Sequence, residues 1–173
     1  MRAFSCALLA ALLCVSTACK HRNVGTIEDG STPALASAVH LADPRSAHQL
    51  AAGFWDVEAR AWRWSKRQFA VVLRPPKGSA QKGATLTVTL TVPPVIIEKE
   101  TSVTLSAAIG DTKLASESWS KAGNYVYKAD VPAAILAGDS VRIDFELDKA
   151  MPPSDKDARE LGIVVSRVGL VSK

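Results

Sequence analysis

Cysteine is absent after residue 19 of this chain. The three copies are Cys6, Cys14 and Cys19, and a protein processed just before residue 19 would keep only the last one. A single thiol cannot form a disulfide within one chain, and it cannot build a thiolate zinc site. The fold therefore depends on its core, and the place of Cys19 needs another explanation.

Several other signals are missing. After the first 18 residues no apolar run is long enough for a transmembrane helix, and no dense Lys/Arg block favours nucleic acid. The three histidines fit no metal motif, and neither a Gly-x-Ser-x-Gly elbow nor a Gly-rich phosphate loop occurs. Glu98 and Glu100 are expected on one strand face in an exposed connection, which gives little support to a glycosidase carboxylate pair. We therefore expect no enzyme activity, no metal and no cofactor.

The N-terminus has the pattern of an export signal. Arg2 is followed by an apolar stretch at residues 3–15, and Ser16, Thr17 and Ala18 are small enough for a signal peptidase. Cleavage after Ala18 predicts a signal peptide at residues 1–18 and leaves Cys19 as the first residue.

A first-residue cysteine can carry a thioether-linked diacylglycerol and an amide-linked acyl chain such as palmitate, which together anchor a protein. The segment resembles a bacterial lipoprotein signal, with Ser16 where Leu is most common. The alternative is an ordinary secretory signal that leaves a soluble protein. Lys20 follows the cysteine in place of the Asp that favours inner-membrane retention in some bacteria. The expected location is thus the cell envelope, at an outer membrane facing the periplasm or the exterior.

Residues 19–37 are expected to be the lipidated N-terminus and a flexible tether, because residues 20–36 mix charge, Gly, Ser, Thr and Pro without apolar periodicity. Residues 38–173 are expected to form one folded domain. Removing the signal deletes one arginine and no acid, so the net charge falls from +4 to +3.

Apolar residues in the domain recur with a period of two, which is typical of strands with one buried face. In residues 84–92 (ATLTVTLTV) Leu and Val alternate with Thr, and in residues 141–147 (VRIDFEL) apolar residues alternate with charges. Further strands are expected at residues 49–57, 61–64, 68–74, 102–109, 113–119, 124–129 and 161–170.

The expected fold is all-β: a single antiparallel two-sheet β-sandwich, jelly-roll-like, of about eight or nine strands. Pro132 precedes a short apolar stretch that ends at Gly138, which predicts one short helical turn and the only one expected.

Short motifs support this fold. They are residues 53–58 (GFWDVE), 62–64 (WRW), 124–127 (NYVY) leading to 131–132 (VP), and 157–165 (DARELGIVV). Together they resemble the galactose-binding-like jelly-roll modules of bacterial surface and glycosyltransferase-associated proteins, over about residues 41–171. The resemblance implies a binding or accessory module more than an enzyme.

The candidate ligand-binding residues are Trp55, Glu58, Trp62, Arg63 and Trp64. Trp62 and Trp64 share a face of an extended strand, and an exposed indole can stack on the apolar face of a sugar ring. The alternative is that these tryptophans are core residues. Arg63 lies on the opposite face, where an ion pair with Asp56 or Glu58 is expected.

A second polar motif consists of Asp157, Arg159 and Glu160. These residues could bind sugar hydroxyls, or an Arg-carboxylate pair could tie the first strand pair to the last strand, which is the preferred interpretation. Asp155 and Asp157 could also offer oxygens to calcium, although a solvated turn explains them better.

Two functions remain open. The first is a lipid-anchored envelope module that binds carbohydrate or another envelope component without catalysis, its partners being the membrane and a glycan. The second is a structural or assembly lipoprotein that contacts an envelope protein through a sheet face or edge. A hydrolase using Asp155, Asp157 and Glu160 ranks below both.

Overall fold

The computed structural model describes residues 33–173. The predicted signal peptide, the acylation site at Cys19 and most of the predicted tether lie outside these residues. The strands are β1 (Ala38–His40), β2 (Leu50–Glu58), β3 (Trp62–Leu73), β4 (Ala84–Val92), β5 (Val103–Ile109), β6 (Thr112–Lys113), β7 (Glu117–Trp119), β8 (Gly123–Val131), β9 (Val141–Leu147) and β10 (Val164–Ser172). The helical segments are η1 (Pro44–Gln49), α1 (Ser79–Lys82), α2 (Pro94–Glu100) and η2 (Ala133–Ile135).

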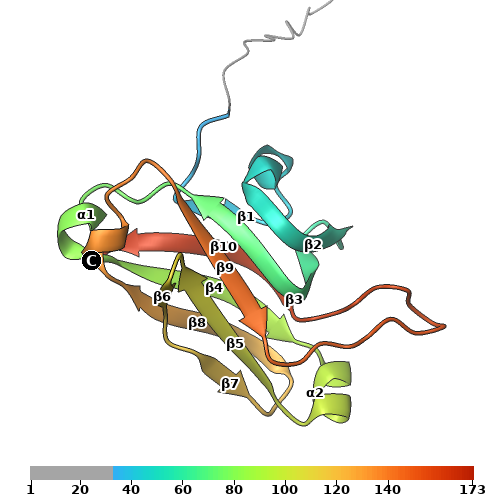
Figure 1. The fold of residues 1–173 in the computed structure, drawn as a ribbon. Helices are drawn as coiled ribbons and strands as arrows, with labels where there is room; N and C mark the ends of the chain where they lie inside the picture. Colours follow the sequence, from blue (N-terminus) through green and yellow to red (C-terminus); the bar gives the residue numbers. More distant parts are fainter. Residues whose placement is uncertain (1–32) are drawn as a thin grey trace, which may run out of the picture. The chain divides into compact units, whose positions relative to one another are not determined.

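Hydrogen bonds join these strands into one curled, antiparallel sheet (Figure 1). The order is β6-β5-β9-β3-β10-β4-β8, with β1 beside β10, β2 beside β3 and β7 beside β5. The mostly-β antiparallel class is confirmed. Two separate sheets are not found among the described residues, because β3 takes part in both halves of the curl.

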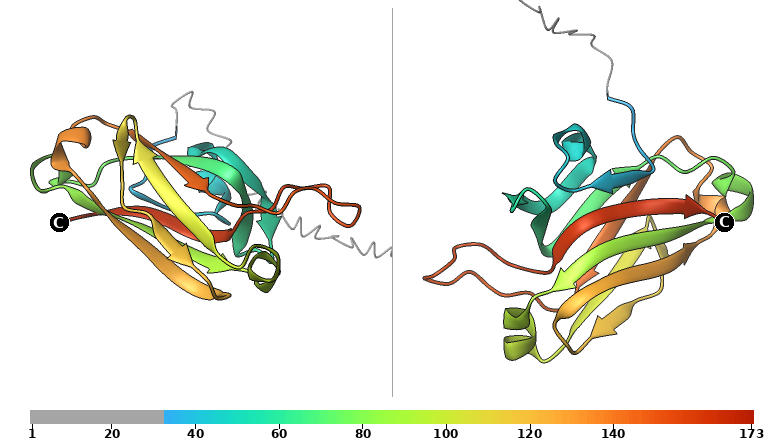
Figure 2. Two further views of the ribbon diagram at one scale, coloured as in Figure 1. Left: turned by 60° about the horizontal axis from the view of Figure 1, so that its bottom comes forward. Right: turned by 180° about the vertical axis from the view of Figure 1, so that it is seen from behind.

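The 12 residues of β3 explain this continuity. Its first part pairs with β10 through Arg63 and Trp64, and its second part pairs with β9 from Gln68 to Leu73. Consequently β9 and β5 lie in front of β10, β4 and β8 in Figure 1, and the view from behind in Figure 2 reverses that order.

The core lies between these two halves of the sheet. The alternation expected in residues 84–92 and 141–147 is confirmed, since Leu86, Val88, Leu90 and Val92 are buried on β4, and Val141, Ile143, Phe145 and Leu147 are buried on β9. Threonines and charged residues occupy the outer faces. Period-two burial therefore decides which face of each strand meets solvent.

Some element predictions are wrong. Residues 61–64 and 68–74 belong to the single strand β3, and residues 113–119 are split between β6 and β7. The strand β1 was not expected, and it brings the described strands to ten. η2 matches the expected helical turn, but η1, α1 and α2 were not expected. Glu98 and Glu100 lie on α2, which starts at Pro94, so they do not share a strand face.

The main chain at Ala36 is already fixed to the fold. The buried Gln49 side chain accepts a hydrogen bond from the Ala36 amide at 3.0 Å and donates to the carbonyls of Ala36 at 3.0 Å and Val72 at 2.8 Å. Leu170 donates its amide to the Ser37 carbonyl at 2.8 Å. Within residues 33–173, Ala36 and Ser37 thus bond to the fold although they precede the predicted start of the domain at residue 38.

Candidate functional site

The predicted tryptophans lie on β2 and β3. Trp55, Trp62 and Trp64 are all partly exposed. The rings of Trp62 and Trp64 meet edge to face with centroids 6.2 Å apart, which agrees with their expected common face. The Trp55 indole donates through Nε1 to the Glu160 carbonyl at 2.8 Å. None of the three is fully buried, and the polar atom of Trp55 already has a partner.

Arg63 does not form the expected ion pair with Asp56 or Glu58. Its Nε donates to the Leu41 carbonyl and its Nη1 to the Trp55 carbonyl, both at 2.8 Å. These bonds satisfy main-chain oxygens beside β3. Arg63 is therefore engaged in holding neighbouring segments together.

Arg159 is the centre of a three-residue cluster that we call the arginine clasp: Glu58, Asp157 and Arg159. Its guanidinium lies 2.6 Å from the Glu58 carboxylate and 2.9 Å from the Asp157 carboxylate. These hydrogen bonds lower the pKa of Asp157 below its ordinary value and raise that of Arg159 further. The clasp ties the loop before β10 to the end of β2.

The arginine clasp also occupies the carboxylate oxygens of Asp157, one of the two residues considered as calcium ligands. Asp157 accepts three hydrogen bonds from the Arg159 side chain and one from its amide. Within residues 33–173 no group of three His, Cys, Asp or Glu side chains comes together as a metal site.

A hollow lies on the outer face of β5, β9 and β3, and we call it the groove. It has a volume of about 740 Å³ and is open to solvent. Small residues make its floor: cross-strand pairing places Ala108 on β5 and Ala70 on β3 on either side of Asp144 on β9. Ala52 and Gly53 of β2 close one wall. Alanine and glycine leave space that larger side chains would fill.

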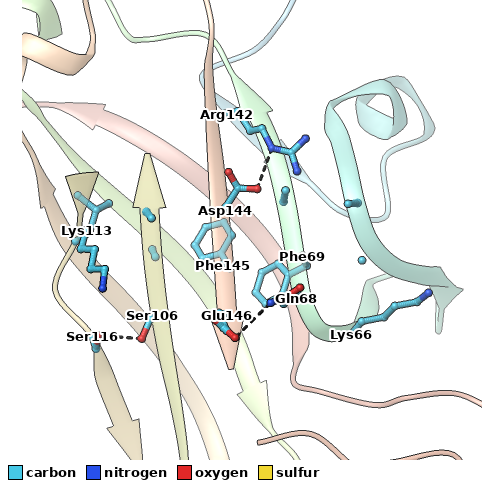
Figure 3. Close-up of a pocket in the computed structure, with 16 residues that line it drawn as sticks. Lys66, Gln68, Phe69, Ser106, Lys113, Ser116, Arg142, Asp144, Phe145 and Glu146 are labelled. Carbon is cyan, nitrogen blue, oxygen red and sulfur yellow. Dashed lines mark hydrogen bonds and ion pairs between the residues drawn. The ribbon is translucent and has the colours of Figure 1, made fainter. Parts of the chain in front are cut away.

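Polar side chains rise around this floor (Figure 3). Arg142 donates to Asp144 at 2.8 Å, and Gln68 donates to Glu146 at 3.3 Å. The hydroxyls of Ser106 and Ser116 are 3.0 Å apart on the other side of β9. The groove thus presents donors and acceptors side by side, which suits a ligand with many hydroxyl groups.

Two lysines stand on opposite sides of the groove. Figure 3 shows Lys113 to one side of β9 and Lys66 to the other. Lys66 also borders a second hollow of about 460 Å³, shared with Gln68 and Glu146. Its ammonium lies 4.6 Å from the centre of the Trp55 ring. The groove therefore adjoins the predicted tryptophan cluster.

Sequence reasoning missed the residues that line the groove. It placed Arg142, Asp144 and Glu146 on a solvent-facing strand side, and that placement is confirmed. It could not place Ala70 and Ala108 beside them, because the order and register of β5, β9 and β3 follow from tertiary packing. The only feature of the sequence that could have indicated the groove was the row of three charged residues on one face of residues 141–147.

No protein-family model matches the chain, and no curated protein sequence is similar to it. A solved structure described as "CBM4 structure and function" aligns with 72% of this chain and 80% of that chain, at 12% identity and a TM-score of 0.35. At that TM-score the likeness carries no argument about function.

None of the helices within residues 33–173 combines the length and the apolar character needed to cross a membrane.

Proposed function

We propose that this protein is a non-catalytic, carbohydrate-binding module of the cell envelope with a jelly-roll-like domain, held at a membrane by acyl chains on Cys19. The observation that carries the proposal is the groove. Its volume of about 740 Å³ is within the usual range for ligand sites.

The lining of the groove supports a sugar as the ligand. Asp144 and Glu146 can accept hydrogen bonds from sugar hydroxyls, while Arg142 and Lys113 can donate to sugar oxygens. The partly exposed Ala108, beside the buried Ala70, offers an apolar surface for the C–H face of a ring. The proposed contacts therefore differ from those expected at Trp55, Glu58, Trp62, Arg63 and Trp64, whose ligand-binding role stays a prediction.

The test is glycan-array binding by the full chain in mild detergent, with a variant that fills the groove. Ala108→Phe places a ring on the floor without removing a polar group, and we expect at least a tenfold loss of affinity. Thr89→Phe is the matched control, because Thr89 is exposed on β4 in the other half of the sheet. Binding that survives Ala108→Phe and disappears in Trp62→Ala would move the ligand to the tryptophan cluster.

The anchor is tested separately. Mass spectrometry of the N-terminal peptide is expected to find acyl groups on Cys19, and Cys19→Ser is expected to release the protein from the membrane fraction. An unmodified Cys19 would contradict the anchor and leave an ordinary secreted protein.

A second function, in envelope assembly, is favoured by the free edge of β8. Among residues 33–173 this nine-residue strand pairs only with β4, so an extended segment of another protein could add to it. Val126, at 51% exposure, lies along this edge. A photo-cross-linker at Val126 in cells, with no glycan bound on the array, would favour this function if it captured one stoichiometric envelope protein.

A further inference from the structure

The carboxylates around the groove already have protein donors. Asp144 accepts from Arg142 at 2.8 Å, and Glu146 accepts from Gln68 at 3.3 Å. In the adjoining hollow, Glu160 accepts from the Arg67 amide at 2.6 Å. A cationic ligand would therefore have to compete with bonds that exist within the protein.

The lysines of the groove differ in this respect. Within residues 33–173 Lys113 forms no ion pair and no side-chain hydrogen bond, and the contact of Lys66 is with the uncharged Trp55 ring. Three cationic side chains, Lys66, Lys113 and Arg142, line the groove against two carboxylates. Its uncompensated charge is positive.

The sheet keeps these lysines apart from the carboxylates. Lys113 on β6 pairs with Ala108, which in turn pairs with Asp144, so Lys113 and Asp144 are separated by two strand spacings. At the usual spacing their Cα atoms are about 10 Å apart, and among residues 33–173 no ion pair forms between them. β6 and β3 are three spacings apart, or about 14 Å, and Lys113 and Lys66 lie on opposite sides of β9 (Figure 3).

We infer that the groove selects an acidic carbohydrate, one whose sugars carry carboxylate groups, and that Lys113 and Lys66 bind those groups. The inference rests on the proposed function and narrows its ligand. A ligand carboxylate would supply the charged partner that each ammonium lacks, while the ring hydroxyls bond to the polar side chains of β9 and β3.

The experiment compares acidic polymers with uncharged forms of the same backbone. Polygalacturonate, alginate and hyaluronan are each tested beside their carboxyl-reduced counterparts, using the full chain in mild detergent and isothermal calorimetry. We expect at least one acidic polymer to bind, its reduced form to bind about tenfold more weakly or less, and the affinity to fall as salt rises.

Variants of single lysines then test whether the acidic polymer binds at the groove. Lys113→Gln and Lys66→Gln are each expected to weaken binding of the acidic polymer about fivefold to tenfold. Lys128→Gln, an exposed lysine on β8 in the other half of the sheet, is the matched control and is expected to leave affinity unchanged. Unfolding curves of all three verify that each variant remains folded.

The outcomes separate the inference from the proposed function. Equal binding of acidic and reduced polymers, or binding of neutral glycans alone on the array, overturns the inference and leaves a carbohydrate-binding groove. An equal loss in Lys128→Gln and Lys113→Gln overturns the assignment to the groove, since it reports diffuse attraction. Absence of binding to every glycan overturns both.

Discussion

Two Arg-Asp pairs of the same sequence spacing have different places in this protein. In the arginine clasp, Arg159 and Asp157 are joined by Glu58 from a strand 101 residues earlier in the chain. In the groove, Arg142 and Asp144 lie on one face of one strand. Arg159 is 32% exposed, whereas Arg142 is 54% exposed.

The role of a polar pair in this small β domain depends on which segments of the chain it connects. A guanidinium that links two segments far apart in the sequence stabilises tertiary structure, because without it the two segments lose that connection. A local pair on an exposed face fixes little and keeps its remaining donors for solvent or ligand. Two pairs of the same residue types can therefore have different roles. The pair that links distant segments supports the fold, and the pair within one strand remains available to a ligand.

The largest effect on both sites is expected from a change in β2, because this strand carries one wall of the groove and Glu58 of the arginine clasp. Gly53 has φ +75°, and a Cβ there would lie 2.0 Å from the Gln68 carbonyl oxygen. We expect Gly53→Ala to lower the free energy of unfolding by about 3 kcal/mol or more, measured by urea denaturation. Gly110→Ala, with φ +54° and nothing within 4 Å of its Cβ, is the control and should cost about 1 kcal/mol. Equal losses would contradict the role of the close strand contact.

The two arginines can be compared directly. Arg159→Ala removes the guanidinium that donates to Glu58 and Asp157, and it is expected to lower the free energy of unfolding by about 1–2 kcal/mol. Arg142→Ala should change it by no more than about 0.5 kcal/mol. Thermal and urea unfolding measure both, and a loss in Arg142→Ala as large as in Arg159→Ala would remove the distinction.

Tyr127 extends the comparison to a buried polar group outside both sites. Its ring is fully buried on β8, its hydroxyl donates to the Ala115 carbonyl, and burial, aided by the Glu117 carboxylate, raises its pKa to about 12. Because the unfolded tyrosine loses its proton near pH 10, stability should fall between about pH 10 and 12.

Tyr127→Phe is expected to cost about 1 kcal/mol at neutral pH and to flatten that alkaline fall. Urea denaturation from pH 8 to 12 measures it. An unchanged alkaline slope in the variant would assign the effect to other groups.

The smallest expected effect concerns Asp157. Its pKa is lowered in the folded protein by the hydrogen bonds from Arg159, so its contribution is present above the unfolded pKa of about 4 and is lost as pH falls through the folded value. Asp157→Asn should therefore show a shallower loss of stability between pH 4 and 2 than the parent. Parallel acid profiles would show that the clasp does not depend on this charge.

Much of the fold follows from local pattern. The alternation in residues 84–92 and 141–147 identified β4, β9 and their buried faces, because a strand has only two sides and one of them must be apolar. The same logic gave β5, β8 and β10 to within a few residues. Each of these predictions needs only the residue and its near neighbours in sequence.

The rest depends on contacts that local pattern does not contain. Arg63 was expected to pair with a carboxylate, but it donates to the main-chain carbonyls of Leu41 and Trp55. Every residue has a main-chain carbonyl, so the sequence does not indicate which of them will accept a hydrogen bond. The groove arises where Ala70 and Ala108, 38 positions apart, flank one strand. α2 was missed because its apolar residues 95–97 fit a strand equally well.

The length of β3 has a consequence for how the domain comes apart. One strand supplies hydrogen-bonding partners to β9 through its second part and to β10 through its first part. If either half melted alone, a stretch of β3 would lose its neighbours while still attached to an ordered remainder. The curl should therefore denature as one cooperative unit, with the same midpoint whether the transition is followed at the groove or at β8.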